Sequence, residues 1–257
     1  AMLPVEGLDT PGVHPCWTLA DAREIAKRVG NGGRVVLIGA GFVACIIMQS
    51  LVRRGAELTL VTGSSGRMVR SMMNPTAGGL IMDWCRNAGI RIITGTRVEG
   101  FGTGPTVTLN NGETLQADLI VVASGVRPNS EFAAQAGIGS EEGIMVDEFL
   151  ETDADGIFAA GDVAQGPEFS TRTRSVHAIQ PTATEHGRIA ALNMAGHRVA
   201  YRGSLGMNVL DTLGLVSSSF GQWQGIDGGD SAISFDAEHF RYMTLEFDDD
   251  RLIGVNS

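Results

Sequence analysis

Residues 34–62 constrain the fold of this chain more than any other stretch. A short apolar run at 35–38 leads into Gly39-Ala40-Gly41-Phe42-Val43-Ala44, and a longer apolar run follows as far as Arg54. A second short run occupies 57–61. Short unbroken apolar runs are typical of parallel strands that are covered on both faces. The stretch therefore predicts a strand, a glycine turn, a helix and a second strand, which is the central unit of an α/β fold.

The spacing of small residues in this turn suits a dinucleotide. Gly39 allows a tight turn, Gly41 removes a side chain that would block a pyrophosphate, and Ala44 lets the helix pack close to the strand. The first helical N–H groups, at Phe42 and Val43, then face an anion with the helix dipole behind them. We predict NAD(P)H at Gly39, Gly41, Phe42, Val43 and Ala44. The alternative is a similar glycine turn in an α/β unit that binds no phosphate.

Composition excludes several classes of protein and partner. The 257 residues suit one large or two ordinary domains, and the net charge of −10 argues against nucleic acid or an anionic membrane as partner. The three cysteines lie far apart, which argues against a disulfide framework, a zinc site and a dithiol relay. The first residues carry no secretory signal pattern, and no apolar run is long enough for a membrane span. We expect a cytoplasmic protein without a bound metal.

The flanking sequence extends the α/β pattern. Residues 1–17 are rich in Pro and Gly and indicate an irregular linker. Thr18 and Asp21 predict a capped helix over 18–29, and Asn74 with Pro75 predicts another over 75–88. Strands are expected at 90–94 and 119–123, with a β-meander between them. The meander strands are predicted at 97–101, 106–109 and 113–115, with Asn110-Asn111-Gly112 as a hairpin turn.

The second half of the chain is less regular. We predict a short strand at 144–146, a strand running into an acidic turn over 152–162, and a polar loop over 164–175. Gln180 and Pro181 open a helix that runs through 195. From residue 201 onward the pattern is β-structure, at 209–221, 232–235 and 241–255, with a hairpin turn at 248–250.

Three separated motifs occur in a definite order. They are the glycine turn at Gly39, the strand end that carries Ser124 and Gly125, and the stretch 157–162 that ends in Gly161-Asp162. Together they resemble the FAD-dependent pyridine nucleotide–disulfide oxidoreductase superfamily. The closest resemblance is to the branch of NADH oxidases, nitrite reductase flavin domains and rubredoxin or ferredoxin reductases. It covers roughly residues 3–200.

The resemblance implies an architecture. It implies an α/β fold in which a Rossmann-like NAD(P)-binding domain with an inserted β-meander is followed by part of an FAD-binding domain and a small β-rich C-terminal segment. The expected boundaries are 1–32 for the linker and crossover helix, 33–130 for the NAD(P)H domain, 131–200 for the second half of a split FAD domain, and 201–257 for a truncated C-terminal segment. Family members carry the first half of the FAD domain upstream, so we expect a fragment, and whether it holds FAD alone is open.

The resemblance also implies roles for individual residues. Asp162, after Gly161, would accept hydrogen bonds from flavin ribitol hydroxyls, as an ionised carboxylate does well. The helix that opens at Pro181 would direct its first N–H groups at the flavin C2 carbonyl and N1, where its dipole stabilises negative charge. Ser124 and Gly125 would flank the nucleotide. The alternatives are a turn aspartate at Asp162 and an ordinary helix start at Pro181.

Two positions depart from the family pattern. Ile46 stands where a Glu near the nicotinamide is common. Thr62 stands where an acidic residue usually binds the adenosine ribose, which removes a repulsive charge for a 2′-phosphate. We count Thr62 and Arg67 among the expected cofactor-binding residues. Ser64, Ser65 and Arg67 would then favour NADPH over NADH slightly. The alternative is a polar surface loop.

The functional prediction is hydride transfer from NAD(P)H to FAD and on to an unidentified acceptor, either a small molecule or a redox protein. No catalytic residue is identified. Cys45 and Cys85 fit the core better than catalysis, and His177 and His186 flank the expected flavin helix. A homodimer is left open. The alternative function is a non-catalytic nucleotide-binding or protein-interaction module.

Overall fold

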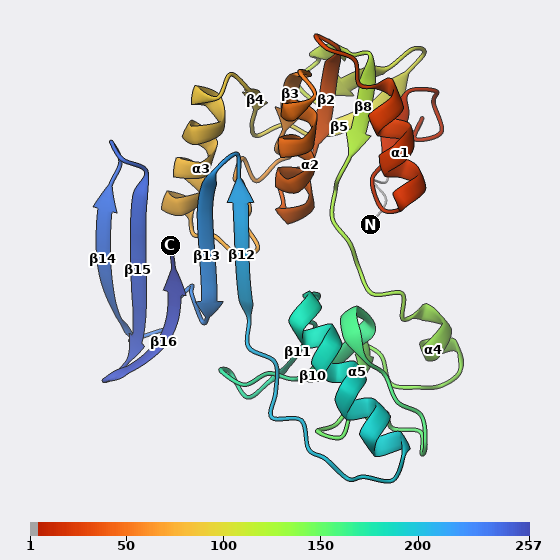
Figure 1. The fold of residues 1–257 in the computed structure, drawn as a ribbon, viewed down its shortest axis with the longest axis vertical. Helices are drawn as coiled ribbons and strands as arrows, with labels where there is room; N and C mark the ends of the chain where they lie inside the picture. Colours follow the sequence, from red (N-terminus) through yellow and green to blue (C-terminus); the bar gives the residue numbers. More distant parts are fainter. Residues whose placement is uncertain (1–4) are drawn as a thin grey trace.

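The chain is described by a computed structural model that covers residues 5–257; residues 1–4 of the predicted linker lie outside the described residues. Figure 1 shows a parallel sheet with its helices at the top, a part that carries α4 and α5 below it, and an antiparallel sheet beside the first part. The fold is α/β with a Rossmann-like core, as the sequence predicts.

The parallel sheet is built around the strand that precedes Gly39. Its five strands run in the order β1-β8-β2-β3-β4, and all four pairings are parallel. The strands are β1 (Val13–Pro15), β2 (Arg34–Ile38), β3 (Glu57–Val61), β4 (Arg91–Ile93) and β8 (Leu119–Val122). Because β2 lies between β8 and β3, the turn that follows β2 has a neighbouring strand end on each side.

Alternate side chains of β2 enter two different cores. Val35 and Leu37 pack in a cluster with residues of all three helices that cover this face. Val36 and Ile38 pack on the other face with Val107 of the meander. The helices are α1 (Leu19–Arg28), α2 (Phe42–Arg53) and α3 (Pro75–Asn87), and the antiparallel meander is β5 (Val98–Gly102), β6 (Thr106–Leu109) and β7 (Thr114–Gln116). The strand is apolar throughout because both of its faces are buried.

The predicted helix starts are confirmed in detail. Thr18 accepts a hydrogen bond from the amide of Asp21, whose carboxylate accepts one from the amide of Thr18, so α1 begins with a capping box. Asn74 caps α3 by accepting a hydrogen bond from the amide of Ala77 at 3.0 Å. In each of these hydrogen bonds the donor and the acceptor are three residues apart, so the sequence alone identifies the caps.

The prediction of an irregular segment over 1–17 was wrong for β1. Val13 to Pro15 pair with β8 and form one edge of the parallel sheet. A proline is tolerated at a sheet edge, and only Val13 of the three residues is buried. A strand this short and this mixed gives no periodic signal.

The part below the parallel sheet also differs from expectation. Residues 152–162 form no strand but a turn closed by an isolated bridge between Glu151 and Phe158, and 164–175 is not a loop but contributes two strands. The elements are α4 (Glu131–Gln135), β9 (Ile144–Met145), the 3₁₀ turn η1 (Gly161–Val163), β10 (Ala164–Pro167), β11 (Arg174–Ser175) and α5 (Gln180–Met194). The strand β10 has the sequence Ala-Gln-Gly-Pro. Small and polar residues of this kind give no strand signal in the sequence.

The C-terminal segment forms an antiparallel sheet in the order β12-β13-β16-β15-β14. Its strands are β12 (Met207–Thr212), β13 (Leu215–Gly221), β14 (Asp230–Asp236), β15 (Arg241–Asp248) and β16 (Arg251–Asn256). Leu210 and Tyr242 join the cluster that contains the three N-terminal helices, so this sheet packs on the helical layer (Figure 1). Of the helices within residues 5–257, none combines the length and the apolarity that a membrane crossing needs.

Candidate cofactor site

The predicted site residues fall into two groups. The first group lies where three neighbouring strands end: Gly39 to Ala44 after β2, Thr62 and Arg67 after β3, and Ser124 with Gly125 after β8. The second group, Gly161, Asp162 and Pro181, lies where η1 meets the start of α5. In Figure 1 the parallel strands point toward the part that holds α5. The carboxyl edge of a parallel sheet is where α/β proteins bind ligands.

Gly39 is the tightest point of the first group. Its φ is +109°, and an added Cβ would overlap the carbonyl oxygen of Ala123 on the neighbouring strand end. Its N–H donates to the carbonyl of Val61 at 2.9 Å, so the turn is tied to the ends of both flanking strands. Only glycine suits this position, because it has no side chain and adopts a positive φ at no cost.

Gly41 differs from Gly39 in every respect that matters for binding. It is the N-cap of α2, with an extended backbone at φ −86° and ψ −171°, and no side chain caps the helix. An added Cβ would meet no atom within 4 Å. The start of α2 therefore combines N–H groups that no side chain caps with open space at Gly41, and an anion site at a helix start requires both. Ala44 is 1% exposed and packs against the sheet.

Thr62 and Arg67, which follow β3, both form hydrogen bonds to main-chain carbonyls. Thr62 is 7% exposed, and its hydroxyl lies 3.4 Å from the carbonyl oxygens of Gly63 and of Ile93, either of which can accept its single hydrogen. Arg67 donates from Nη2 to the carbonyl of Met73 at 2.9 Å. Ser64 and Ser65 are exposed. A ribose contact by the Thr62 hydroxyl stays a prediction that this geometry does not favour.

The second group is centred on a histidine. The N–H of Gly161 donates to Nδ1 of His186 at 3.4 Å, and Asp162 is exposed beside it. His186 is 1% exposed and lies edge-on to the Tyr201 ring, with centroids 4.7 Å apart. Burial, and after it the neighbouring His177, lowers the pKa of His186. The imidazole is therefore neutral, with Nδ1 as acceptor. The sequence placed His186 near the expected flavin helix but gave no sign of its bond to Gly161.

The thiols fit the structural interpretation given to them. Cys45 and Cys85 are both fully buried. Burial raises the pKa of Cys45 to about 11 and that of Cys85 to about 12. Both thiols stay protonated near neutral pH, so neither serves as a nucleophile. Within residues 5–257, no group of three or more His, Cys, Asp or Glu side chains is placed to bind a metal ion.

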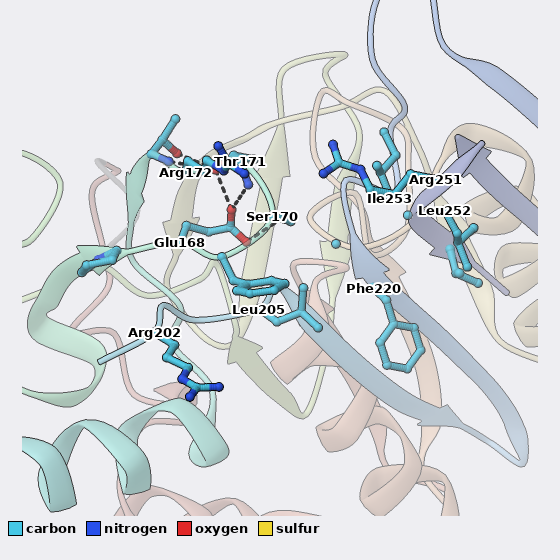
Figure 2. A pocket seen from close by; sticks show the side chains of 16 residues that line it. Glu168, Ser170, Thr171, Arg172, Arg202, Leu205, Phe220, Arg251, Leu252 and Ile253 are labelled. Carbon is cyan, nitrogen blue, oxygen red and sulfur yellow. Dashed lines mark hydrogen bonds between the residues drawn. The ribbon is translucent and has the colours of Figure 1, made fainter. Parts of the chain in front are cut away.

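A separate groove lies between the β10–β11 loop and the C-terminal sheet (Figure 2). Phe169, Leu205 and Phe220 contribute apolar side chains, and Arg172 and Arg251 are exposed among its lining. Burial raises the pKa of the Glu168 carboxyl there, but hydrogen bonds from Thr171 and Ser170 outweigh it and hold that pKa below the usual value. The groove contains none of the predicted cofactor residues.

Comparison with known proteins places the chain in context. Residues 1–185 match the sequence profile of the family described as pyridine nucleotide-disulphide oxidoreductase. The NADH-dependent phenylglyoxylate dehydrogenase subunit epsilon of Aromatoleum evansii is 34% identical over 265 residues, which cover 100% of this chain and 62% of that protein. Rhodocoxin reductase of Rhodococcus erythropolis is 31% identical over 208 residues, which cover 78% of this chain and 48% of the relative.

A solved structure shows the same arrangement. The ferredoxin reductase for the CYP199A2 system from Rhodopseudomonas palustris superposes with a TM-score of 0.88 at 28% identity, over 100% of this chain and 64% of that one. The chain thus spans about half to two thirds of the length of the relatives it matches.

Proposed function

The chain belongs to the pyridine nucleotide-disulphide oxidoreductase family, and on that premise we propose that it forms the NAD(P)H-binding part and the second half of the FAD-binding part of a flavin-dependent oxidoreductase. The complete enzyme passes a hydride from NAD(P)H to FAD and sends the electrons on to an acceptor. The domain boundaries at 33–130, 131–200 and 201–257 are part of this proposal.

One observation carries the NAD(P)H assignment. The turn after β2 combines a glycine that the fold requires, Gly39, with a glycine that the fold does not require, Gly41. Empty space next to Gly41 lies directly before the uncapped first turn of α2. A pyrophosphate fits this cradle because main-chain N–H groups and the helix dipole both favour a negative charge there. Ser124 and Gly125, at the adjacent strand end, would border the same cofactor.

The second group, Gly161, Asp162 and Pro181, offers two features that suit a flavin. Asp162 presents an exposed carboxylate to accept hydrogen bonds from ribitol hydroxyls. The exposed Pro181 lies in the first turn of α5, where the helix dipole favours negative charge. When bound, FAD would supply the hydride-accepting chemistry. The residues of this chain would orient it and stabilise its charge.

The acceptor and the assembly are also proposals. Relatives named as reductases and as a dehydrogenase subunit favour an enzyme over a non-catalytic module. We propose a small molecule or a redox protein as acceptor, a cytoplasmic location in keeping with three free cysteines, and a homodimer as the assembly to test by light scattering. The full-length protein should be yellow and should bleach when NADH or NADPH is added anaerobically; a colourless full-length protein would favour the binding module.

Titration of this chain with NADH and NADPH tests the nucleotide site directly. We expect both to bind, and we expect Gly41→Val to raise the dissociation constant by about ten-fold or more, since its side chain would occupy the space for the pyrophosphate. The melting temperature should fall only slightly, because valine is a poorer N-cap than glycine but Gly41 has an extended backbone and open surroundings.

Gly79→Val is the matched control. Gly79 lies in α3, also with no atom within 4 Å of an added Cβ, and away from the turn. Its substitution should leave the dissociation constant unchanged. Equal affinity for the unaltered chain and Gly41→Val would refute the placement of the pyrophosphate.

A further inference from the structure

The segment between β3 and α3, residues 62–74, closes against the glycine turn. The N–H of Val69 donates to the carbonyl of Ala40 at 2.7 Å, and Met68 and Val69 are completely buried in the cluster that contains Ala40 and Ala44. Val69 has a φ of +48°. A β-branched residue rarely adopts this left-handed conformation and keeps it only where the surroundings impose it. The shape of the β3–α3 segment therefore depends on contacts from outside it.

One such contact comes from the opposite end of the chain. Asn256, in β16, is 0% exposed. Its Nδ2 donates to the carbonyl of Met72 at 2.7 Å, and its Oδ1 accepts from the N–H of Asn74 at 3.0 Å. One side-chain amide thus holds the main chain on both sides of Met73, and a buried amide with satisfied donors and acceptors fixes geometry strongly.

A second contact joins the same segment to β15. The side-chain Nδ2 of Asn74 donates to the hydroxyl of Tyr242 at 2.6 Å. The other atom of that amide, Oδ1, caps α3 through the N–H of Ala77. Asn74 therefore links three elements: the β3–α3 segment, the start of α3 and the C-terminal sheet.

We propose that the C-terminal sheet, through Asn256 and Tyr242, positions the β3–α3 segment for the adenosine end of bound NAD(P)H. In a βαβ dinucleotide site, the end of the second strand is where the adenosine ribose lies, and that strand here is β3. Asn256 is then a positioning residue: it touches no cofactor and acts through Met72 and Asn74. This inference rests on the proposed function.

The experiment compares two asparagine clamps, the buried Asn256 and the half-buried Asn193. Asn256→Leu removes the clamp on the β3–α3 segment. Asn193→Leu removes a similar clamp in α5, where Asn193 donates to the carbonyls of Phe149 and Val199 and accepts from the N–H of Val199. Dissociation constants for NADH and for ADP-ribose are measured for the unaltered chain and both variants, with melting curves alongside.

We expect Asn256→Leu to raise both dissociation constants by about ten-fold, and by the same factor, because ADP-ribose retains the adenosine end. Asn193→Leu should lower the melting temperature but leave both constants unchanged. A loss of affinity for NADH without a loss for ADP-ribose, or equal losses in the two variants, would overturn the inference.

Tyr242→Phe keeps the test decisive if Asn256→Leu does not fold. It removes one hydroxyl and should raise both dissociation constants by about three-fold. Tyr201→Phe is its control, since it removes a buried hydroxyl that bonds Ser204 at 2.9 Å in the other part of the chain. Unchanged affinity in Tyr242→Phe would count against the inference.

Hydrogen exchange separates this inference from the proposed function. In the ligand-free chain, the Val69 amide should exchange faster in Asn256→Leu or Tyr242→Phe than in the matched controls. Equal protection of Val69 would refute the positioning role. If the unaltered chain binds neither NADH nor ADP-ribose, the proposed function fails. Hydrogen exchange of the Val69 amide still shows in that case whether Asn256 and Tyr242 position the segment. If the unaltered chain binds both and the variants bind as tightly, only the inference fails.

Discussion

The turns at Gly39 and at Gly161 both place a positive-φ glycine in front of an expected cofactor, but they are held differently. Gly39 lies between the ends of β8 and β3, where the main chain leaves no room for a Cβ. Gly161 rests on α5, with a hydrogen bond of 3.4 Å to His186 and ordinary contact, 3.6 Å, between an added Cβ and Ala183. The first turn is part of a buried sheet, and the second rests on side chains of a helix.

This difference indicates which of the two turns tolerates a substitution of its glycine. Main-chain packing in a sheet cannot adjust to an added atom, because it would have to move two strands. A turn that rests on side chains can adjust through rotamers. We therefore expect the chain to lose stability when Gly39 changes, and to lose much less when Gly161 changes.

The largest expected effect is that of Gly39→Ala. The added Cβ would overlap Ala123 and would sit at a φ of +109°, so we expect a loss of about 3 kcal/mol or more in the free energy of unfolding. Chemical denaturation measures it.

Gly63→Ala is the control for Gly39→Ala. Its φ is +81°, with no atom within 4 Å of an added Cβ, so only the backbone cost of about 1–2 kcal/mol applies. Similar losses in the two variants would show that Ala123 does not constrain the turn.

Gly161→Ala is expected to have a smaller effect. Its φ of +78° carries the backbone cost, but an added Cβ would make only ordinary contact with Ala183. We expect a loss of about 1–2 kcal/mol, close to that of Gly63→Ala. A loss as large as that of Gly39→Ala would contradict the contrast between the two turns.

The smallest expected effect depends on pH and involves His186. Burial lowers the pKa of His186 from its ordinary value of 6.5, so the unfolded chain binds more protons than the folded chain as the pH falls. Stability is therefore complete above about pH 6.5 and declines as the pH falls through the folded-state pKa. His186→Gln removes the titrating imidazole and should reduce this decline.

Urea denaturation at pH 7.5, 6.5 and 5.5 compares the two proteins. The decline should not vanish in His186→Gln, because burial also lowers the pKa of His14 and of His177. An identical pH dependence in both proteins would show that His186 is not buried as a neutral group.

The fold of the region around the parallel sheet was predictable because its signals are local. The strand β2, the glycine turn and α2 are encoded by one continuous stretch, and the caps at Thr18 and Asn74 are encoded within three residues of their partners. The antiparallel meander and the hairpin turn before β16 were also correct. Each of these elements follows from φ/ψ preference and side-chain periodicity over a few residues.

The same reasoning failed where an element is formed by its pairing partners rather than by the pattern of its own residues. The strand β10 is formed by small and polar residues, and it exists because β9 pairs with it on one side and β11 on the other. At the candidate site, the sequence named Asp162 and Pro181 but could not show that His186 holds the Gly161 turn. The role of Thr62 as a cofactor-binding residue stays a prediction; tertiary packing turns its hydroxyl toward main-chain carbonyls.

The sequence by itself determined that a dinucleotide-type βαβ unit would form, because one continuous stretch encodes the apolar strand, the tight turn that Gly39 permits and the helix that follows. Only the tertiary structure decided that Val13 to Pro15 complete the sheet and that Asn256 holds Met72 and Asn74. The reason is physical: backbone preference acts between neighbours, whereas a buried hydrogen bond between residues 182 positions apart exists only after packing has brought both groups together and removed water from them.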